Sequence, residues 1–404
     1  MPSAKRVWCL RFVTVRPVDR TPVDTDDPAY LSTLVDLGRS LGLDRIGVTD
    51  ASILDRARTA LVDRVDRGLS DTMGFTFRNP ERSTDPQRAV DGARSVIVAA
   101  RSYNLPDQDV DHLPLQARVA RYAQVDQYTP LRRALQVIAR RLRADGHRAV
   151  VFADENDLVD REVAHRAGLG WFGRNANLLL PGGGSFFSLG SVVTTARLPT
   201  ASRVVPDGCG SCRQCIDDCP TAAIVDDGVI DARRCLAWLV QKPGVFPVEY
   251  RVALGDRIYG CDACQTGCPP NLRLADRFRA RSSDVEASVP GARVDLMDIL
   301  DADDPTLLDR FGAWYLADRD PLWLRRNALV ILANVAPLPV DDRVRGVLCR
   351  YLSSDNPVLC AHAVWAARRL GCDDLVNDHC DPNPIHDIVR IELSRSNDEV
   401  GRRR

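Results

Sequence analysis

Two cysteine runs in the middle of the chain restrict its fold more than any other feature. The first reads Cys209-Gly-Ser-Cys-Arg-Gln-Cys-Ile-Asp-Asp-Cys219-Pro, and the second reads Cys261-Asp-Ala-Cys-Gln-Thr-Gly-Cys268-Pro. Both end in Cys-Pro, where proline fixes φ and removes a backbone donor. Such a density of thiols points to bound metal or to disulfides.

The spacing favours iron–sulfur clusters. The pattern C-x2-C-x2-C-x3-C-P is that of bacterial ferredoxins, in which three thiolates hold one [4Fe-4S] cluster and the fourth reaches its neighbour. The second run lacks a fourth cysteine, and Cys235 lies between the two runs. We therefore predict two ligand sets, the first being Cys209, Cys212, Cys215 and Cys268, and the second Cys219, Cys235, Cys261 and Cys264. A pair of zinc sites is the remaining alternative, although zinc ligands commonly come as separate CxxC pairs.

Composition limits the partners of the chain. With 54 basic and 55 acidic side chains among 404 residues, the net charge is −1, so a nucleic acid must be met by a local basic patch. Residues 1–16 do not read as an export signal, and no stretch approaches about 18 uncharged apolar residues. We expect a cytoplasmic monomer with reduced thiols and no membrane partner.

Upstream of the cysteine runs, helical and strand patterns alternate, which predicts an α/β or α+β domain. The segment 1–27 reads as a loose extension, and the segment from 68 to 86 as a loop. The expected helices cover 28–42, 53–65 and 129–145, and the expected strands cover 45–49, 95–100, 148–153 and 186–195.

A polar segment follows the strand at 148–153, at the edge where α/β sheets collect ligands. Its first acid, Asp154, is either a proton donor or the N-cap of the next helix, and the residues alone favour the cap. Beyond that helix, Gly168, Gly170 and Gly173 suit close approach of the backbone to a large flat ligand. They do not form a dinucleotide-binding fingerprint.

Downstream of the cysteine runs, the pattern is helical. Residues 327–334 and 360–367 are two similar small-residue cores, each preceded by another helix, which predicts HEAT-like repeats. The sequence thus predicts a ferredoxin-like double-cluster module inserted between an α/β domain and an all-α region. The predicted domains are 28–200, 201–285 and 286–393, followed by a disordered tail over 394–404.

The order of these motifs resembles the epoxyqueuosine reductase family. The resemblance rests on Asp154 and Arg161, on Ala167-Gly-Leu-Gly-Trp-Phe-Gly-Arg-Asn175, and on Tyr259-Gly-Cys-Asp-Ala-Cys-Gln-Thr-Gly-Cys-Pro-Pro-Asn271. It implies binding of cobalamin and two [4Fe-4S] clusters, and deoxygenation of epoxyqueuosine to queuosine in tRNA. It also implies that Asp154 donates a proton and that Arg161 assists. The implied cobalamin contacts are Asn175, Asn177, Leu178, Ser185, Leu189 and Ala196.

The resemblance further implies partners. An external donor such as a flavodoxin or ferredoxin would supply electrons, and the helical region, with Arg325, Arg326 and Asn327, would grip the anticodon stem-loop. The chain departs from the family pattern at Gln127, Thr129 and Asp157. Two other functions stay open: a cobalamin and iron–sulfur reductase of a small molecule, as in reductive dehalogenases, and an electron-transfer module without chemistry of its own.

Overall fold

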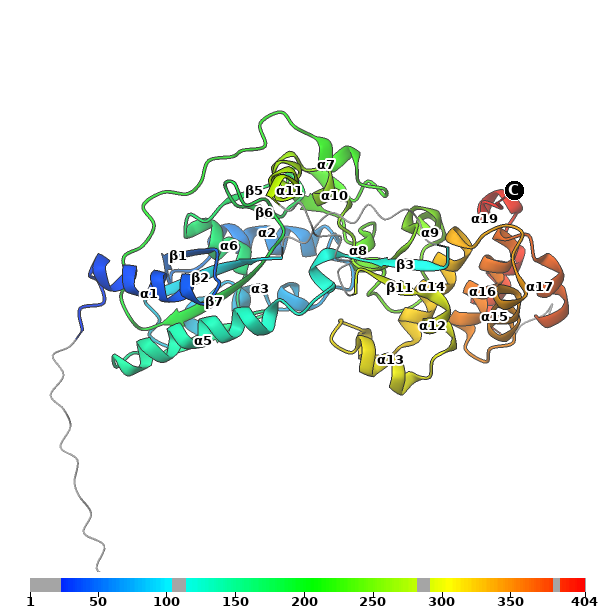
Figure 1. Ribbon diagram of the computed structural model, residues 1–404, viewed down its shortest axis with the longest axis horizontal. Coiled ribbons are helices and arrows are strands. Elements are labelled where there is room, and N and C mark those ends of the chain that lie inside the picture. Colours follow the sequence, from blue (N-terminus) through cyan, green and yellow to red (C-terminus); the bar gives the residue numbers. More distant parts are fainter. Residues whose placement is uncertain (1–22, 104–113, 282–290, 381–385, 404) are drawn as a thin grey trace, which may run out of the picture.

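A four-stranded antiparallel sheet forms the centre of the N-terminal half of the protein (Figure 1). The computed structural model describes residues 23–103, 114–281, 291–380 and 386–403. Most of the predicted extension over 1–27 and the predicted boundary at residue 285 lie outside these ranges. In the order of the sheet, the strands are β1 (Arg45–Asp50), β2 (Ser95–Ser102), β7 (Phe187–Thr194) and β4 (Ala149–Phe152).

The pairing brings three chain segments to one edge of this sheet. Because β2 and β4 are both antiparallel to β7, they run in the same direction. Ser102 pairs with Phe187, so β2 ends where β7 begins, and Phe152 pairs with Ser191, so β4 ends at the middle of β7 and the chain after it continues towards the same side. The four strands predicted from sequence are present, and their antiparallel pairing makes the domain α+β.

Helices cover both faces of the sheet, as the uninterrupted apolar run of β2 predicts. Ile97 and Ala99 face the core under α1 (Pro28–Ser40) and α5 (Tyr128–Ala144). Val96 and Val98 face the core under α2 (Asp55–Asp66) and α6 (Asp160–Arg166). Between these elements lie short ones, and the segment predicted as a loop over 68–86 contains two of them and the start of a third. They are η1 (Phe75–Phe77), α3 (Pro80–Ser83), α4 (Pro86–Ala89), β3 (Gln116–Val119), η2 (Arg121–Ala123), β5 (Trp171–Phe172) and β6 (Leu178–Leu179).

The cysteine-rich module consists of short elements that alternate with turns. Its strand β10 lies beside β3, and β11 (Arg293–Asp295) lies on the other side of β3, so a second small sheet joins the module to both neighbouring regions. The module contains α7 (Gln214–Asp217), β8 (Ile224–Asp226), β9 (Val229–Ile230), α8 (Leu236–Leu239), α9 (Val248–Leu254), β10 (Arg257–Tyr259), α10 (Ala263–Thr266) and α11 (Pro269–Arg281).

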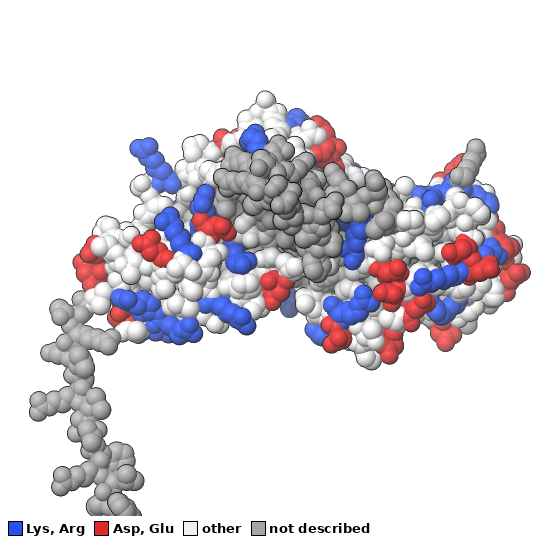
Figure 2. Space-filling view, in the orientation of Figure 1, with Lys and Arg blue, Asp and Glu red and all other residues white. Residues whose placement is uncertain are grey.

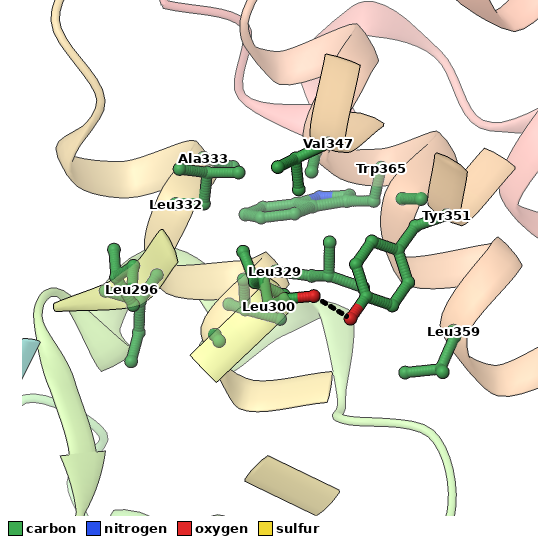
Figure 3. Close-up of a cluster of buried hydrophobic side chains, with 14 of the residues drawn as sticks. Leu296, Leu300, Leu329, Leu332, Ala333, Val347, Tyr351, Leu359 and Trp365 are labelled. Atoms are coloured by element: carbon green, nitrogen blue, oxygen red, sulfur yellow. Dashed lines mark hydrogen bonds between the residues drawn. The ribbon is translucent and has the colours of Figure 1, made fainter. Parts of the chain in front are cut away.

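The C-terminal region is helical, and its core is continuous with buried residues of the cysteine-rich module (Figure 3). Trp365 and Leu329 meet there, and the Tyr351 hydroxyl donates a hydrogen bond to the Leu300 carbonyl at 2.8 Å. The predicted small-residue cores fall in α14 and α16, which pack against each other; the HEAT-like repeat stays a prediction. The helical elements are α12 (Leu296–Asp301), α13 (Asp304–Phe311), η3 (Ala317–Arg319), α14 (Leu322–Val335), α15 (Asp342–Leu352), α16 (Pro357–Arg369), α17 (Asp373–His379), α18 (Asp387–Ser394) and α19 (Asn397–Val400).

Acidic and basic side chains are interspersed over the visible face of this helical region (Figure 2). Their mixture agrees with the net charge of −1. In the parts of the chain that the structure describes, we find no helix with the length and apolar character of a membrane span.

The structure corrects the predicted RNA-gripping role of α14. Arg326 and Asn327 are fully buried, and Arg325 is paired with Asp304. The Arg326 guanidinium donates to four backbone carbonyls at the end of α8 and beyond it, in Leu239, Val240, Lys242 and Gly244. Burial lowers the pKa of Arg326 to about 9. Arg326 and Asn327 therefore hold the cysteine-rich module on the helical region, and they are not available to contact RNA.

The predicted disordered tail is also wrong for the described part of it. The side chain of Ser396 and that of Glu399 form a reciprocal capping box that starts α19. Val400 is buried, and the Arg403 guanidinium donates to the carbonyls of Ala333 and Ala336 at the end of α14. A short polar tail is therefore ordered because it caps another helix.

We predict that Arg326→Met lowers the free energy of unfolding by about 3 kcal/mol or more, because each buried carbonyl left unsatisfied costs roughly 1–3 kcal/mol. The matched control is Arg390→Met, since Arg390 lies in an exposed pair with Asp387. The control should change stability by less than about 0.5 kcal/mol. Urea unfolding followed by circular dichroism measures both, and equal effects of the two changes would contradict the role of Arg326.

Candidate functional site

A cavity of about 1000 Å³ lies between the edge of the main sheet and the cysteine-rich module. Tyr103 reaches it from the end of β2, Asp154 from the end of β4, and Ser185 from the segment before β7. Cys235 and Cys264 line it from the module. Pockets for small molecules usually measure roughly 300–1,000 Å³, so this one suits a large ligand.

The eight cysteines predicted as ligands are free thiols, and the structure brings them together in two groups. Cys268 interacts electrostatically with Cys209, Cys212 and Cys215. In the second group, Cys264 interacts with Cys219, Cys235 and Cys261. Cys219, the last cysteine of the first run, thus lies in the second group, and Cys268, the last of the second run, lies in the first group. These groups are the predicted ligand sets. Cys215 also acts on Cys264, so the two groups are adjacent.

The chemistry of these thiols fits bound metal. Burial, reinforced by the neighbouring thiols, raises the pKa of Cys235 to about 11 and the pKa of Cys268 to about 11. Four thiolates placed together oppose one another's ionisation until a cation neutralises them. Around Cys219, the Ala223 N–H donates to the sulfur at 3.2 Å, which is the kind of contact that tunes a bound cluster.

Cavities border both groups. A second cavity of about 220 Å³ is lined by all four thiols of the first group, whereas Cys235, Cys261 and Cys264 of the second group line the large one. In the described part of the chain, no three His, Cys, Asp or Glu side chains are close enough to hold a single metal ion. Ligands of a four-iron cluster stand wider apart than those of one ion, so this spacing is compatible with clusters.

Asp154 occupies a strained position at the end of β4, with φ of 60° in the left-handed region. The N-cap of α6 is Val159, so the N-cap interpretation of Asp154 is wrong. The side chain is open to the cavity, yet the surrounding protein displaces bulk water and raises the pKa of Asp154. Glu155 adds to the rise and Arg132 opposes it. Asp157, one of the departures from the family pattern, is paired with Arg82.

Asp160 is a second acid in this cavity, which the sequence analysis did not single out. It is the first residue of α6, and the Ser191 hydroxyl donates a hydrogen bond to its carboxylate at 3.2 Å. Burial raises the pKa of Asp160 to about 7, and the charge of Asp154 contributes. Tyr128 interacts electrostatically with both acids. Arg161 also lines the cavity and donates only a long hydrogen bond, of 3.4 Å, to the Ala176 carbonyl.

Of the six residues predicted to contact cobalamin, five line the large cavity and one lies in the hydrophobic core. Asn175, Asn177, Leu178, Ser185 and Leu189 line the cavity. Ala196 does not, because it lies beyond the end of β7 and packs in the core under α1 and α5. Its predicted contact is therefore wrong.

Two of the cavity residues also dock the module. The Asn175 amide donates to the Cys264 carbonyl at 2.8 Å, and the Ser185 hydroxyl bonds the Gln265 side chain at 2.9 Å. The Asn271 carboxamide accepts from the Ser185 N–H at 2.7 Å. Gly184 before it has φ of +65°, and a Cβ there would lie 2.1 Å from the Asn271 oxygen. Sequence reasoning missed Gln265 and Asn271, although both flank cysteines of the second run.

The three glycines of the Gly168–Gly173 segment serve mainly the packing of the chain on itself. A Cβ on Gly170 would lie 2.1 Å from the Leu179 carbonyl oxygen across the β5–β6 hairpin. A Cβ on Gly168 would lie 2.9 Å from the Arg203 carbonyl oxygen. Of the three, Gly173 lines the large cavity. Close approach of the backbone to a ligand stays a prediction, and of the three positions only Gly173 lies where a ligand in this cavity could meet it.

Comparison with known families agrees with this site. Residues 208–271 match a family model described as a 4Fe-4S double cluster binding domain. The fold and the site therefore define an iron–sulfur redox protein with a double-cluster domain. Residues 83–155 match a second model, described as Epoxyqueuosine reductase QueG, DUF1730.

Whole-chain relatives give the family. An epoxyqueuosine reductase of Bacillus anthracis is 31% identical over 345 residues, covering 83% of this chain and 87% of the relative. One of Xanthomonas campestris pv. campestris is 33% identical over 366 residues, covering 87% and 98%. A crystal structure of epoxyqueuosine reductase with a modified tRNA-Tyr stem loop has a TM-score of 0.80 and 25% identity, covering 92% of this chain and 99% of that one. The chain belongs to the epoxyqueuosine reductase family.

We predict that the Asp160 carboxyl makes stability depend on pH. Its pKa is raised on folding, so the folded state binds the proton more tightly, and the stability due to that proton is lost as the pH rises towards about 7. Asp160→Asn removes this loss. The stability of the variant relative to the native chain should grow from pH 4 to pH 7 and level off above it. Urea unfolding at several pH values measures the difference, and a difference independent of pH would disprove the burial of this charge.

Proposed function

We propose that the protein deoxygenates epoxyqueuosine to queuosine in tRNA, with electrons relayed by two [4Fe-4S] clusters. Family membership and the tRNA stem loop held by the structural relative support this proposal. The observation that carries it is the shared cavity, where Asp154, an acid of raised pKa, lies with three thiols of the second group. Deoxygenation of an epoxide takes up two electrons and two protons and releases water, so it needs an electron entry and acids at one place.

The two thiol groups would be the ligands of the two clusters. Cys212 of the first group is exposed, so that group is the entry for electrons from an external donor such as a flavodoxin or ferredoxin. Three thiols of the second group line the large cavity, against one, Cys209, of the first, so the second cluster would deliver the electrons there. The adjacency of Cys215 and Cys264 supports transfer from one group to the other.

Cys235→Ser tests the ligand assignment, because Cys235 is the thiol that the spacing alone does not supply. The variant should retain about four iron atoms per chain after anaerobic reconstitution, against about eight in the native chain. Cys349→Ser is the matched control, since Cys349 is also a partly buried free thiol but lies in α15. Iron and sulfide analysis measures this, and eight iron atoms in Cys235→Ser would remove Cys235 from the ligand set.

The residues of the large cavity fit cobalamin. Its wall joins apolar side chains such as Leu178, Leu189 and Phe172 with the amide of Asn177, which suits a broad ring with polar edges. None of the described residues that line it is a histidine. Asn175, Asn177, Leu178, Ser185 and Leu189 would hold cobalamin, which would supply a reduced metal centre for the reaction.

The acids of the chain complete the reaction. Asp154 protonates the oxygen of the opening epoxide, and burial, which raises its pKa, favours the protonated form that a donor needs. Asp160, which lies in electrostatic reach of Asp154, supplies the second proton needed to release water. Arg161, exposed in the same wall, balances the negative charge that forms there.

We predict that Asp154→Asn lowers turnover about 10²- to 10⁴-fold, the usual contribution of a positioned acid, while the corrin absorbance on binding stays unchanged. Asp157→Asn is the matched control, because that carboxylate is paired with Arg82. The assay uses the anaerobically reconstituted protein and tRNA carrying the epoxide, with the nucleoside product analysed. Native turnover in Asp154→Asn would remove the proton-donor role, and absence of queuosine with the native chain would overturn the proposed function.

A further inference from the structure

Aromatic side chains from three distant segments meet at the large cavity. Phe75 lines the cavity, and its ring meets that of Tyr315 edge-on, with 5.1 Å between centroids. On its other side, Phe75 meets Trp238 at 6.1 Å. Phe75 itself has φ of 40°, a left-handed conformation that a bulky residue rarely adopts. The fold therefore holds this ring in place at a backbone cost.

The backbone of Tyr315 is fixed, whereas its ring is left open. Its N–H donates to the Tyr259 hydroxyl at 2.8 Å, and the Tyr259 ring stacks on Trp314 with 4.5 Å between centroids. The Trp314 indole in turn donates to the Ala123 carbonyl at 3.2 Å. Tyr315 is nevertheless 45% exposed, and its hydroxyl has no hydrogen-bond partner among the described residues. A rigidly mounted, exposed ring is what a stacking platform requires.

Two exposed arginines that follow Phe75 and Tyr315 closely in the sequence have no acidic partner among the described residues. Arg78, three residues after Phe75, is exposed and lies next to Gly74, where a Cβ would be 3.4 Å from its guanidinium. Arg319, four residues after Tyr315, is exposed and donates only a 3.4 Å hydrogen bond to the Gly312 carbonyl. Within the described ranges, neither forms an ion pair with a carboxylate. Most other exposed arginines near the helical region do form one, as Arg310 does with Asp298.

We propose that the Tyr315 ring stacks on a nucleotide flanking the modified base, while Arg78 and Arg319 contact the adjacent phosphates. This proposal rests on the proposed function. When one base of a single-stranded loop enters a pocket, its neighbours lie at the rim, and splayed bases are commonly held by aromatic rings and arginine planes. An exposed ring in segments that also carry exposed guanidinium groups without a described carboxylate partner suits a base with its phosphates better than it suits an apolar protein surface.

The test compares Tyr315→Leu with Tyr315→Phe, which keeps the ring. Both retain the backbone N–H that anchors the segment, and unchanged cluster absorbance and melting temperature confirm folding. An anticodon stem-loop with 2-aminopurine beside the modified position reports stacking as fluorescence quenching. We expect Tyr315→Leu to bind it roughly 5- to 150-fold more weakly and without quenching, the range for loss of one stacked base. Tyr315→Phe should behave like the native chain.

Equal affinity and equal quenching in Tyr315→Leu would overturn the inference. If Tyr315→Leu instead weakened reduction by a flavodoxin without changing the RNA affinity, the ring would belong to a protein-docking surface, which also overturns it. Turnover by the native chain distinguishes failure of the Tyr315 platform from failure of the proposed function. If the native chain turns over the modified tRNA, either of these two results for Tyr315→Leu rejects the Tyr315 platform alone. If the native chain shows no turnover, the proposed function and the platform are both rejected.

Discussion

The docking of the cysteine-rich module on the main sheet is the interaction on which the site depends. Ser185, Gln265 and Asn271 form a buried hydrogen-bonded network between the start of β7 and the second cysteine run. Asn175 adds a bond to the backbone of a ligand cysteine. A buried polar network that is fully paired fixes one arrangement, because any shift leaves polar groups unsatisfied in a poorly solvated place. It therefore sets the distance between the thiols and the acids of the sheet edge.

The same docking explains the electrostatics of the cavity. Closing the module over the sheet edge removes water from Asp154, Asp160 and the thiols of the second group, and each of them has a raised pKa where a shift is resolved. For the acids, this favours the protonated form that a donor needs. For the thiols, it is a penalty that bound iron would cancel. Docking of the module thus favours both the protonated acids that donate protons and the binding of iron that carries electrons.

The sequence allowed prediction of those features that local spacing encodes. The cysteine intervals indicated which thiols come together, and the apolar run at 95–100 indicated a strand covered on both faces. Features that depend on distant contacts were missed or mistaken. Arg326 was read as a surface cation because its neutral partners, carbonyls more than eighty residues away, leave no local signal. Ala196 and the tail were misplaced for the same reason, and Asp160 acquires its raised pKa only from the folded surroundings.

The central claim is that two iron clusters occupy the two thiol groups, one of them beside the cavity. Anomalous scattering at the iron absorption edge, from crystals of the anaerobically reconstituted protein, tests it directly. The account predicts two iron peaks, one enclosed by Cys209, Cys212, Cys215 and Cys268, and one by Cys219, Cys235, Cys261 and Cys264 at the cavity wall. A single iron peak, or scattering at the zinc edge in place of iron, would contradict it.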